Sequence, residues 1–356
     1  MQPPAHSNRF YGIQWLRALA ALLVVLDHLG EIGGALIPSA PSVPILLNGQ
    51  FGVDIFFPIS GFVMYLTAQS CLRHADWRRF AGRRLLRVVP PYYLLTLLMV
   101  VLILLRPALF AQTHLTPWYT AASFLFLPVR NASGNISPLL PVGWTLTYEM
   151  LFYGVLTALI AWRLPLLRGA VVVLAPLAVL GFFIPNRWPA IASLASPLEL
   201  EFLAGMAIAA ALPWLRRLPW QLPALLAPVA LALPLVVGFS LGLPRCLVWG
   251  IPGALLVACF AALEPHLRFD RWTTPLLLGD ASYSLYLTHL FVLRLAGMAA
   301  VRFGMRGALG LFALDAAGLT CAVLVAVPFH LYVELPIIAA LSNMRVSWSL
   351  RSAGQP

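Results

Sequence analysis

Long apolar runs alternate with short polar segments along the whole chain. Each run is close to the roughly 20 residues that a helix needs to cross a lipid bilayer. The pattern therefore predicts an all-α integral membrane protein, a bundle of about ten transmembrane helices. The two weakest runs are short and bounded by proline, at 169–185 and 197–213. The ten predicted spans are 12–36, 45–70, 88–106, 143–162, 169–185, 197–213, 222–241, 246–263, 275–300 and 308–335.

The composition agrees with this class. Of the 356 residues, 61% are hydrophobic and only 10% are charged, whereas a soluble domain has about 25% charged residues. A net charge of +11 would suit a nucleic-acid partner, but the arginines mark the loops between apolar runs. We therefore expect the chain to meet a lipid bilayer and no nucleic acid. The four cysteines form neither a CxxC pair nor a disulfide framework, so we interpret them as packing residues and expect no metal site.

The arginines also predict an orientation. With the N-terminus in the cytoplasm, fifteen loop arginines fall inside and six outside, and the other two of the 23 lie within spans. This bias satisfies the positive-inside rule. We expect a multi-pass membrane protein with both termini cytoplasmic. Residues 1–340 would form one transmembrane domain and 341–356 a short cytoplasmic tail.

The first span, "YGIQWLRALAALLVVLDHLGEIGG", carries charged groups that lipid would not tolerate. Arg17 and His28 are eleven residues apart, which places them within roughly 20° on one helix face. Glu31 follows one turn beyond His28 on much the same face, whereas Asp27 points elsewhere. This polar stripe must face the interior of the bundle or water.

Other spans place ionisable groups at a similar depth. His28, Asp54 and Glu149 all lie roughly 6 Å outward of the midpoints of their spans, and His289 and Ser60 lie near the centre. A histidine beside carboxylates is the composition of a general base with its orienting partner. Each group also has a structural interpretation: a packed histidine, an aspartate in a solvated funnel, or a glutamate paired with an arginine.

A second constellation lies in "RRFAGRRLLRVVPPYY". Arg84 and Arg87 are three residues apart on one helix face. Two adjacent guanidinium groups suit a phosphate or pyrophosphate, and their cytoplasmic position suggests a phosphorylated cytoplasmic donor. The alternative is that these arginines only fix the orientation of the chain.

Two late segments are less specific. In "SYSLYLTH", Ser282, Tyr283 and His289 either line a cavity or belong to helix packing and an interfacial aromatic belt. In "YVELP", Glu334 is as consistent with an ion pair to a nearby arginine as with a functional role.

Together these motifs resemble those of the acyltransferase 3 family, membrane-bound O-acyltransferases that modify bacterial glycans. Arg17 and His28 resemble its R-x10-H signature, "FGVDIFFPISGF" its second-span motif, and Arg84 and Arg87 its R-x-x-R pair. "GWTLTYEMLFY" resembles the segment with the family's acid, here Glu149, and "LGDASYSLYLTH" and "YVELP" resemble the late motifs. The resemblance covers essentially the whole chain in the right order. Pro58 and Leu335 depart from the family's usual residues.

The resemblance implies a protein of the bacterial cytoplasmic membrane that transfers an acyl group, most often acetyl, from acyl-coenzyme A to a sugar hydroxyl, without a metal. Arg84 and Arg87 would bind the nucleotide end of the donor, and the pantetheine arm would follow the stripe that Arg17 and His28 form. His28 would act as general base, with Glu149 or Asp54 fixing its tautomer.

Ser60, Tyr283 and His289 would line the donor path, and an acyl-enzyme on His28 or Ser60 is an alternative to direct transfer. The acceptor, which ranges from O-antigen, exopolysaccharide and peptidoglycan to a small glycoside, stays open, as do acyl length and oligomeric state.

Two other functions compete with the enzyme. Intramembrane histidines and carboxylates also build proton relays, so the chain is alternatively a transporter or flippase of an acylated or glycan substrate without covalent chemistry. The R-x-x-R pair and the lack of paired broken spans argue against that reading. The third option is a non-catalytic partner in a glycan-assembly complex.

Overall fold

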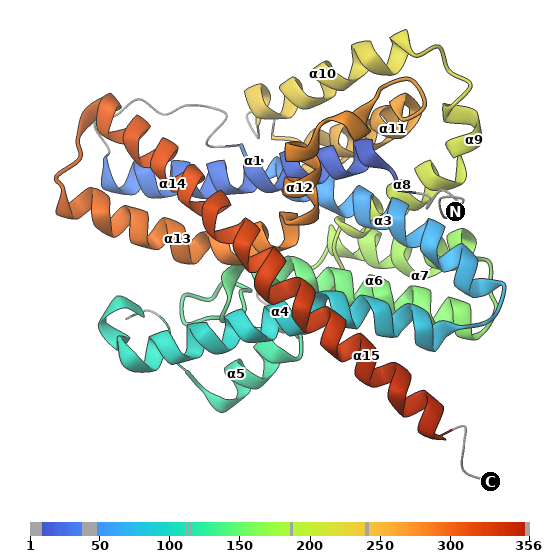
Figure 1. Cartoon of the computed structure of the whole chain (residues 1–356), viewed down its shortest axis with the longest axis horizontal. Helices are drawn as coiled ribbons and strands as arrows, with labels where there is room; N and C mark the ends of the chain where they lie inside the picture. Colours follow the sequence, from blue (N-terminus) through green and yellow to red (C-terminus); the bar gives the residue numbers. More distant parts are fainter. Residues whose placement is uncertain are drawn as a thin grey trace, which may run out of the picture. The chain divides into compact units, whose positions relative to one another are not determined.

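The computed structural model describes residues 9–37, 48–110, 113, 115–185, 188–238 and 242–352. Regular structure in these ranges is helical, apart from an isolated antiparallel bridge between Arg130 and Ile136. The helices, shown in Figure 1, are α1 (Tyr11–Leu36), α3 (Phe51–Leu72), α4 (Trp77–Leu105), α5 (Pro117–Phe124), α6 (Trp144–Ala161), α7 (Leu166–Gly181), α8 (Glu199–Ala210), α9 (Leu212–Leu215), α10 (Gln221–Val237), α11 (Ile251–Leu263), α12 (Thr273–Asp280), α13 (Ser282–Arg302), α14 (Gly307–Phe329) and α15 (Leu335–Ser352). Two short π-helical turns, η4 (Cys246–Gly250) and η6 (His330–Glu334), precede α11 and α15.

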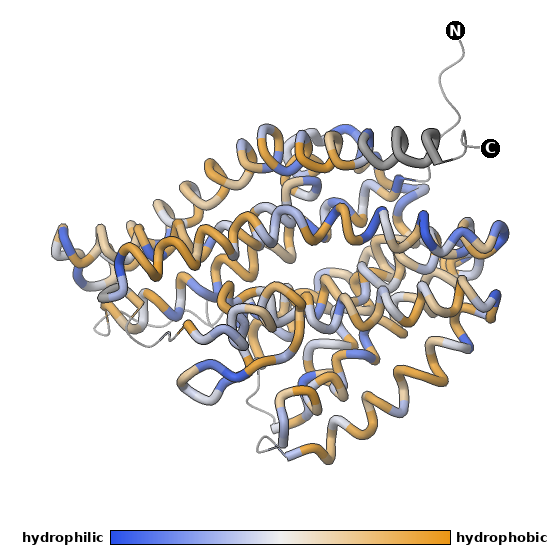
Figure 2. Tube along the Cα trace, turned by 90° about the horizontal axis from the view of Figure 1, so that it is seen from below, coloured by the Kyte–Doolittle hydropathy of each residue, from blue (hydrophilic) through white to orange (hydrophobic). Residues whose placement is uncertain are grey.

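The predicted class is confirmed. Eight helical segments among the described residues are long and apolar enough to cross a membrane, and α7 and α10 are shorter apolar helices of 16 and 17 residues. Together they correspond to the ten predicted spans. Figure 2 shows apolar residues running along the helices.

Several boundaries differ from the predicted spans. The helix predicted from residue 88 already begins at Trp77, capped by Asp76, whose side chain accepts a hydrogen bond from the Arg79 N–H at 3.1 Å. The span predicted at 275–300 breaks at Ala281 into α12 and α13. The last span continues through η6 into α15 as far as Ser352, so helix replaces the start of the predicted tail.

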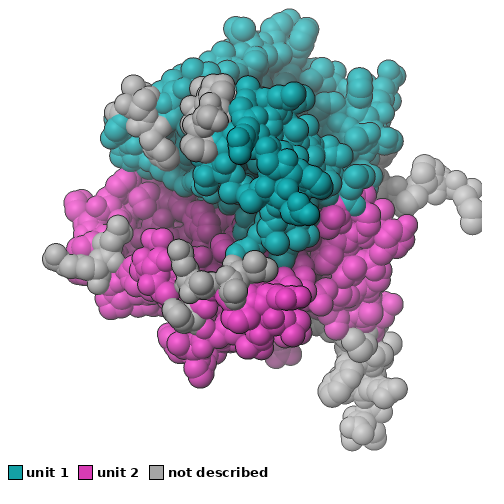
Figure 3. Space-filling view, turned by 90° about the vertical axis from the view of Figure 1, so that its left-hand side faces the viewer, with its two compact units in different colours: residues 1–64, 201–285, 289–324 teal, residues 65–200, 286–288, 325–356 magenta. Residues whose placement is uncertain are grey.

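The chain divides into two compact units (Figure 3). Unit 1 comprises residues 1–64, 201–285 and 289–324, and unit 2 comprises residues 65–200, 286–288 and 325–356. Most of α1, α3, α8 and α10–α14 belongs to unit 1, and α4–α7 and α15 belong to unit 2.

Close backbone contacts fix the helices of unit 1. A Cβ atom added at Gly52 of α3 would lie 2.2 Å from the carbonyl oxygen of Ala20 in α1, and one at Gly279 of α12 would lie 2.2 Å from that of Gln14. Small residues let membrane helices approach in this way. The helix α1 therefore packs closely against both α3 and α12.

The middle of α3 contains Pro58, which has no N–H to give to the carbonyl of Asp54 four residues earlier. That carbonyl lies against α11, where a Cβ atom added at Gly253 would be 2.1 Å from it. One turn further, a Cβ at Gly205 of α8 would be 2.0 Å from the carbonyl oxygen of Pro58. The proline and the glycines thus allow α3 to pack tightly between α8 and α11.

In unit 2, α4 packs against α6 and α15. The Tyr92 hydroxyl donates to the carbonyl of Ser123 at 2.9 Å, and the Ser123 hydroxyl accepts from the Leu139 N–H at 3.0 Å. These bonds tie α4 to the segment between residues 107 and 142, which lies between two predicted spans and contains α5.

Candidate active-site residues

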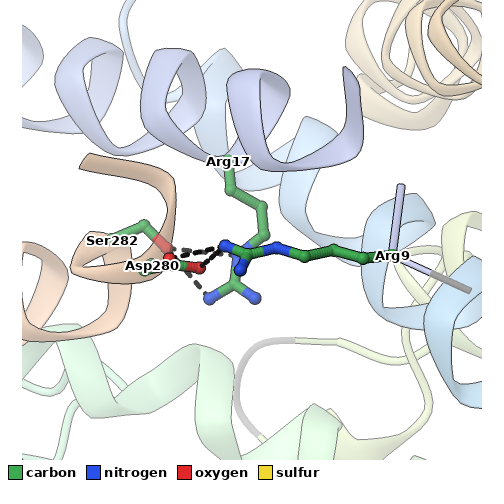
Figure 4. A network of polar contacts seen from close by, with 4 residues as sticks. All are labelled: Arg9, Arg17, Asp280 and Ser282. Carbon is green, nitrogen blue, oxygen red and sulfur yellow. Dashed lines mark hydrogen bonds and ion pairs between the residues drawn. The ribbon is translucent and has the colours of Figure 1, made fainter. Parts of the chain in front are cut away.

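The arginine of the polar stripe is anchored at the start of α13. The Nε and Nη2 atoms of Arg17 donate to the hydroxyl oxygen of Ser282 at 3.2 and 3.0 Å, and Ser282 is fully buried. Just beside this contact, Arg9 forms an ion pair with Asp280 at 2.6 Å (Figure 4). The polar end of α1 is therefore held to the break between α12 and α13.

The histidine of the stripe meets the same helix further along. The rings of His28 and His289 have centroids 5.0 Å apart in an edge-to-face arrangement, and His289 is fully buried. Since Arg17 and His28 both contact α13, the prediction that they share a face of α1 is confirmed. His289 is therefore brought beside His28, and its predicted role at the donor path stays a prediction.

Hydrogen bonds fix the tautomers of both histidines. The Nδ1 atom of His28 lies 2.9 Å from the carbonyl oxygen of Val24, and Nδ1 of His289 lies 3.0 Å from that of Leu285. A carbonyl oxygen only accepts, so each Nδ1 carries the hydrogen, and in a neutral imidazole Nε2 is then the basic nitrogen. In the neutral form of His28 the basic nitrogen is thus Nε2.

Asp54 has a different partner from the one expected. It is completely buried in α3 and accepts two hydrogen bonds from Arg245, at 2.9 Å from Nε and 2.7 Å from Nη2. The structure therefore shows Val24 and not Asp54 bonded to His28 Nδ1. The hydropathy pattern places Arg245 between two predicted spans, and no local sequence signal connects it to Asp54, 191 positions away.

Ser60 lies in α3 two residues after Pro58, and Tyr283 follows Ser282 in α13. Both side chains are half-buried and belong to unit 1. Their predicted place along a donor path stays a prediction.

The predicted donor site lies in unit 2. The Nη2 atom of Arg84 donates to the Thr67 hydroxyl at 3.1 Å, and the guanidinium lies 5.9 Å from the centre of the Phe80 ring. Arg87 is one turn further along α4. The two arginines thus stand together on a helix face, as predicted.

Glu149 belongs to the same unit, on α6. Its carboxylate accepts a hydrogen bond from the Tyr153 hydroxyl one turn later. Glu149 and Tyr153 both lie close enough to Arg84 to interact with its charge. The structure therefore groups the predicted acid with the arginine pair, and its role toward His28 stays a prediction.

Glu334 pairs with a histidine that sequence reasoning missed. In η6, Nδ1 of His330 lies 2.9 Å from Oε2 of Glu334, and both side chains are buried. The sequence shows that the two residues are four positions apart. A histidine at the end of an apolar run does not by itself indicate an ion pair, however, so this contact was not predicted. The described residues contain no group of three or more potential metal ligands.

Comparison with known proteins decides the family. A family model of the acyltransferase domain matches residues 10–331, most of the chain. The chain belongs to the acyltransferase 3 family. As an acyltransferase 3 protein with many apolar helices, it is a membrane acyltransferase.

Two curated acyltransferase 3 relatives are similar over most of their length. The chain is 34% identical over 312 residues to the exopolysaccharide production protein ExoZ of Rhizobium meliloti (strain 1021), covering 85% of this chain and 93% of ExoZ. It is 30% identical over 301 residues to BcsY of Komagataeibacter xylinus, named as a membrane-bound transacylase, covering 79% and 72%. No solved structure matches the chain significantly.

Proposed function

We propose that this acyltransferase moves an acyl group, acetyl in the simplest case, from acyl-coenzyme A to a hydroxyl of an exopolysaccharide or related glycan. The observation that best supports this proposal is the hydrogen bond of His28. Its Nδ1–H donates to the Val24 carbonyl, so Nε2 is the basic nitrogen. It stands on the helix face that also carries the anchored Arg17. The name of the relative ExoZ supports a polysaccharide acceptor.

In the proposed reaction, Nε2 of His28 takes the proton of the acceptor hydroxyl as its oxygen attacks the thioester carbonyl carbon. The tetrahedral intermediate then collapses, the carbon–sulfur bond breaks, and the thiolate of coenzyme A takes the proton from His28. Atoms and charge balance with no other reactant. The Val24 carbonyl keeps the imidazole in its tautomer and stabilises the imidazolium that forms transiently.

The remaining residues have supporting roles in this scheme. Arg17 offers a fixed positive charge to the donor arm or to the oxyanion. Arg84 and Arg87 bind the phosphates of coenzyme A from the cytoplasm. Ser60, Tyr283 and His289 border the path of the thioester.

Substitution of the base tests the reaction. The acceptor is a purified exopolysaccharide from which O-acyl groups have been removed chemically, and the readout is acetyl transfer from labelled acetyl-coenzyme A by the purified enzyme. We expect His28→Ala to lower kcat at least about 100-fold, because general base catalysis contributes that much or more. The control His266→Ala changes an exposed histidine and should keep full activity. Full activity in His28→Ala would contradict the proposed mechanism.

Donor binding is tested separately by thermal stability. Acetyl-coenzyme A should raise the Tm of the wild type in a concentration-dependent way. The shift should vanish in Arg84→Ala/Arg87→Ala and persist in Arg79→Ala/Arg83→Ala, a double change at exposed arginines of the same helix. No shift in the wild type would contradict a coenzyme A donor and favour a transporter.

A further inference from the structure

The arginines near the start of α4 do not all face solvent. Arg79 and Arg83 are exposed, whereas Arg84 and Arg87 are half-buried. Phe80, one turn before Arg84, is buried, and its ring centre lies 5.9 Å from the Arg84 guanidinium. Exposed arginines are enough to orient a helix in the membrane. The inward position of Arg84 therefore needs a further reason.

The side chain of Arg84 is fixed from the neighbouring helix. Thr67 lies about 8 Å before the end of α3, and Arg84 lies about 11 Å after the start of α4. Because only a short segment joins the two helices, these positions meet at a similar height, and Nη2 of Arg84 donates to the Thr67 hydroxyl at 3.1 Å. The Nε atom of Arg84 is buried and has no acceptor among the described residues. The bond to Thr67 is thus the contact that sets the direction of the guanidinium plane.

The acceptor of this bond is a neutral hydroxyl, which leaves the positive charge of Arg84 in place. Arg245 in unit 1 differs, because both of its hydrogen bonds to Asp54 end on a carboxylate that balances its charge. A hydroxyl oxygen orients a guanidinium group but carries no net charge. Glu149 is near enough to act on the charge of Arg84, and the positive Arg87 acts in the opposite sense. Arg84 is therefore oriented by its anchor without being neutralised by it.

We propose that Thr67 is a positioning residue of the donor site. Its hydroxyl holds Arg84 in the orientation in which the guanidinium group meets a phosphate of coenzyme A. Arginine binds phosphate best when its N–H groups already point in the required directions. Thr67 lies between the second-span motif and the R-x-x-R pair and belongs to neither. This inference rests on the proposed function, because it concerns the donor of that reaction.

Two substitutions separate the hydroxyl from the shape of the side chain. Thr67→Val removes the hydroxyl and keeps the shape, whereas Thr67→Ser keeps the hydroxyl. We expect Thr67→Val to raise the KM for acetyl-coenzyme A about fivefold, the usual scale for one lost hydrogen bond, with kcat and the acceptor KM unchanged. Thr67→Ser should restore the KM of the wild type. If Thr67→Val does not fold, as judged from its Tm without ligand, Thr67→Ala provides the same test.

The matched control is Thr157→Val in α6. Thr157 is also half-buried, but its hydroxyl donates to the carbonyl of Tyr153 in the same helix at 2.7 Å. The same chemical change at this position should leave the KM for acetyl-coenzyme A as it is in the wild type.

A competitor shows which end of the donor is affected. Adenosine 3′,5′-bisphosphate carries phosphates of the nucleotide end of coenzyme A and has no acyl arm. It should inhibit the wild type in competition with acetyl-coenzyme A. Its inhibition constant should rise in Thr67→Val by the same factor as the KM, which a general packing defect would not produce.

Each outcome has a distinct meaning. Transfer by the wild type with an unchanged KM for acetyl-coenzyme A in Thr67→Val overturns the positioning role and leaves the proposed function standing. A loss shared by Thr67→Ser or Thr157→Val shows a packing effect and overturns it too. So does a lack of competition by the bisphosphate in the wild type. If the wild type neither transfers acetyl groups nor gains Tm with acetyl-coenzyme A, the proposed function fails, and the role of Thr67 fails with it.

Discussion

At the scale of single residues, the two side chains of the ion pair between Asp54 and Arg245 differ in their exposure to solvent. Asp54 is fully enclosed, whereas the Arg245 side chain is 25% exposed. The carboxylate therefore depends on the two parallel hydrogen bonds of the guanidinium for compensation of its lost hydration.

Removing only the arginine should cost more than removing both charges. We expect Arg245→Met to lower the free energy of unfolding by about 3 kcal/mol, because it leaves a buried carboxylate uncompensated. The double variant Asp54→Asn/Arg245→Met should recover part of that loss. Denaturant unfolding in detergent micelles measures both. Additive losses in the double variant would show that the two side chains do not stabilise one another.

Glu264 provides a pH-dependent contact just after α11. Its two carboxylate oxygens accept from the N–H groups of Tyr11 and Gly12, both at 2.8 Å, at the start of α1. Burial raises the pKa of Glu264 above its ordinary value near 4.5 despite these hydrogen bonds. The protonated form is thus favoured by folding, and this contribution to stability is present below pH 4.5 and is lost as pH rises through the folded pKa.

Glu264→Gln should therefore become more stable relative to the wild type as the pH rises. The amide resembles the protonated acid and does not titrate. The Tm of the variant minus that of the wild type should increase from pH 4.5 upward until the folded pKa has been passed. The control Asp270→Asn changes an exposed acid whose pKa is lowered from its ordinary value near 3.8 by its hydrogen bond from Arg268, so the difference between that variant and the wild type should stay constant from pH 4.5 upward. A difference for Glu264→Gln that falls with pH would contradict the assignment.

At the scale of helices, the tight packing of α3 predicts which glycines tolerate a side chain. Gly205→Ala would place a methyl group 2.0 Å from the backbone of Pro58, so α3 and α8 must separate. We expect a loss of about 1–3 kcal/mol, which is typical of overpacking.

The matched control is Gly154→Ala on α6, where nothing lies within 4 Å of the added atom. That change should be neutral or stabilise by up to about 1 kcal/mol, since alanine favours helix. Equal Tm values of the two variants would show that α3 and α8 are not packed as described.

Helix periodicity predicted the shared face of Arg17 and His28, because 100° per residue holds within one helix. It did not predict the contact of Asp54 with Arg245, which depends on how α3 packs against the chain that leads into α11. The hydropathy of residues 308–335 located a span but not the end of the helix. Hydropathy predicts only the part of a helix that lies within the bilayer. The helix α15 continues through polar residues to Ser352, because no proline or glycine interrupts it after Pro336.

At the scale of the whole molecule, the orientation depends on whether the two short helices cross the bilayer. With 16 residues, α7 is about 24 Å long, against a hydrocarbon thickness of about 30 Å. Thinning of the bilayer and the flanking non-helical residues can cover that difference at modest cost. The excess of arginines in the loops predicted to be cytoplasmic requires that α7 does cross.

Single cysteines on either side of α7 test this topology. The four native cysteines are replaced by alanine, and Leu164→Cys or Trp188→Cys is added, both at exposed positions. A membrane-impermeant maleimide applied to intact spheroplasts should label Trp188→Cys and leave Leu164→Cys unlabelled until the membrane is permeabilised. Asn131→Cys, between α5 and α6, should behave like Trp188→Cys, and Arg83→Cys near the start of α4 like Leu164→Cys. If neither position around α7 is labelled until the membrane is permeabilised, α7 does not cross and every later span has the orientation opposite to the predicted one.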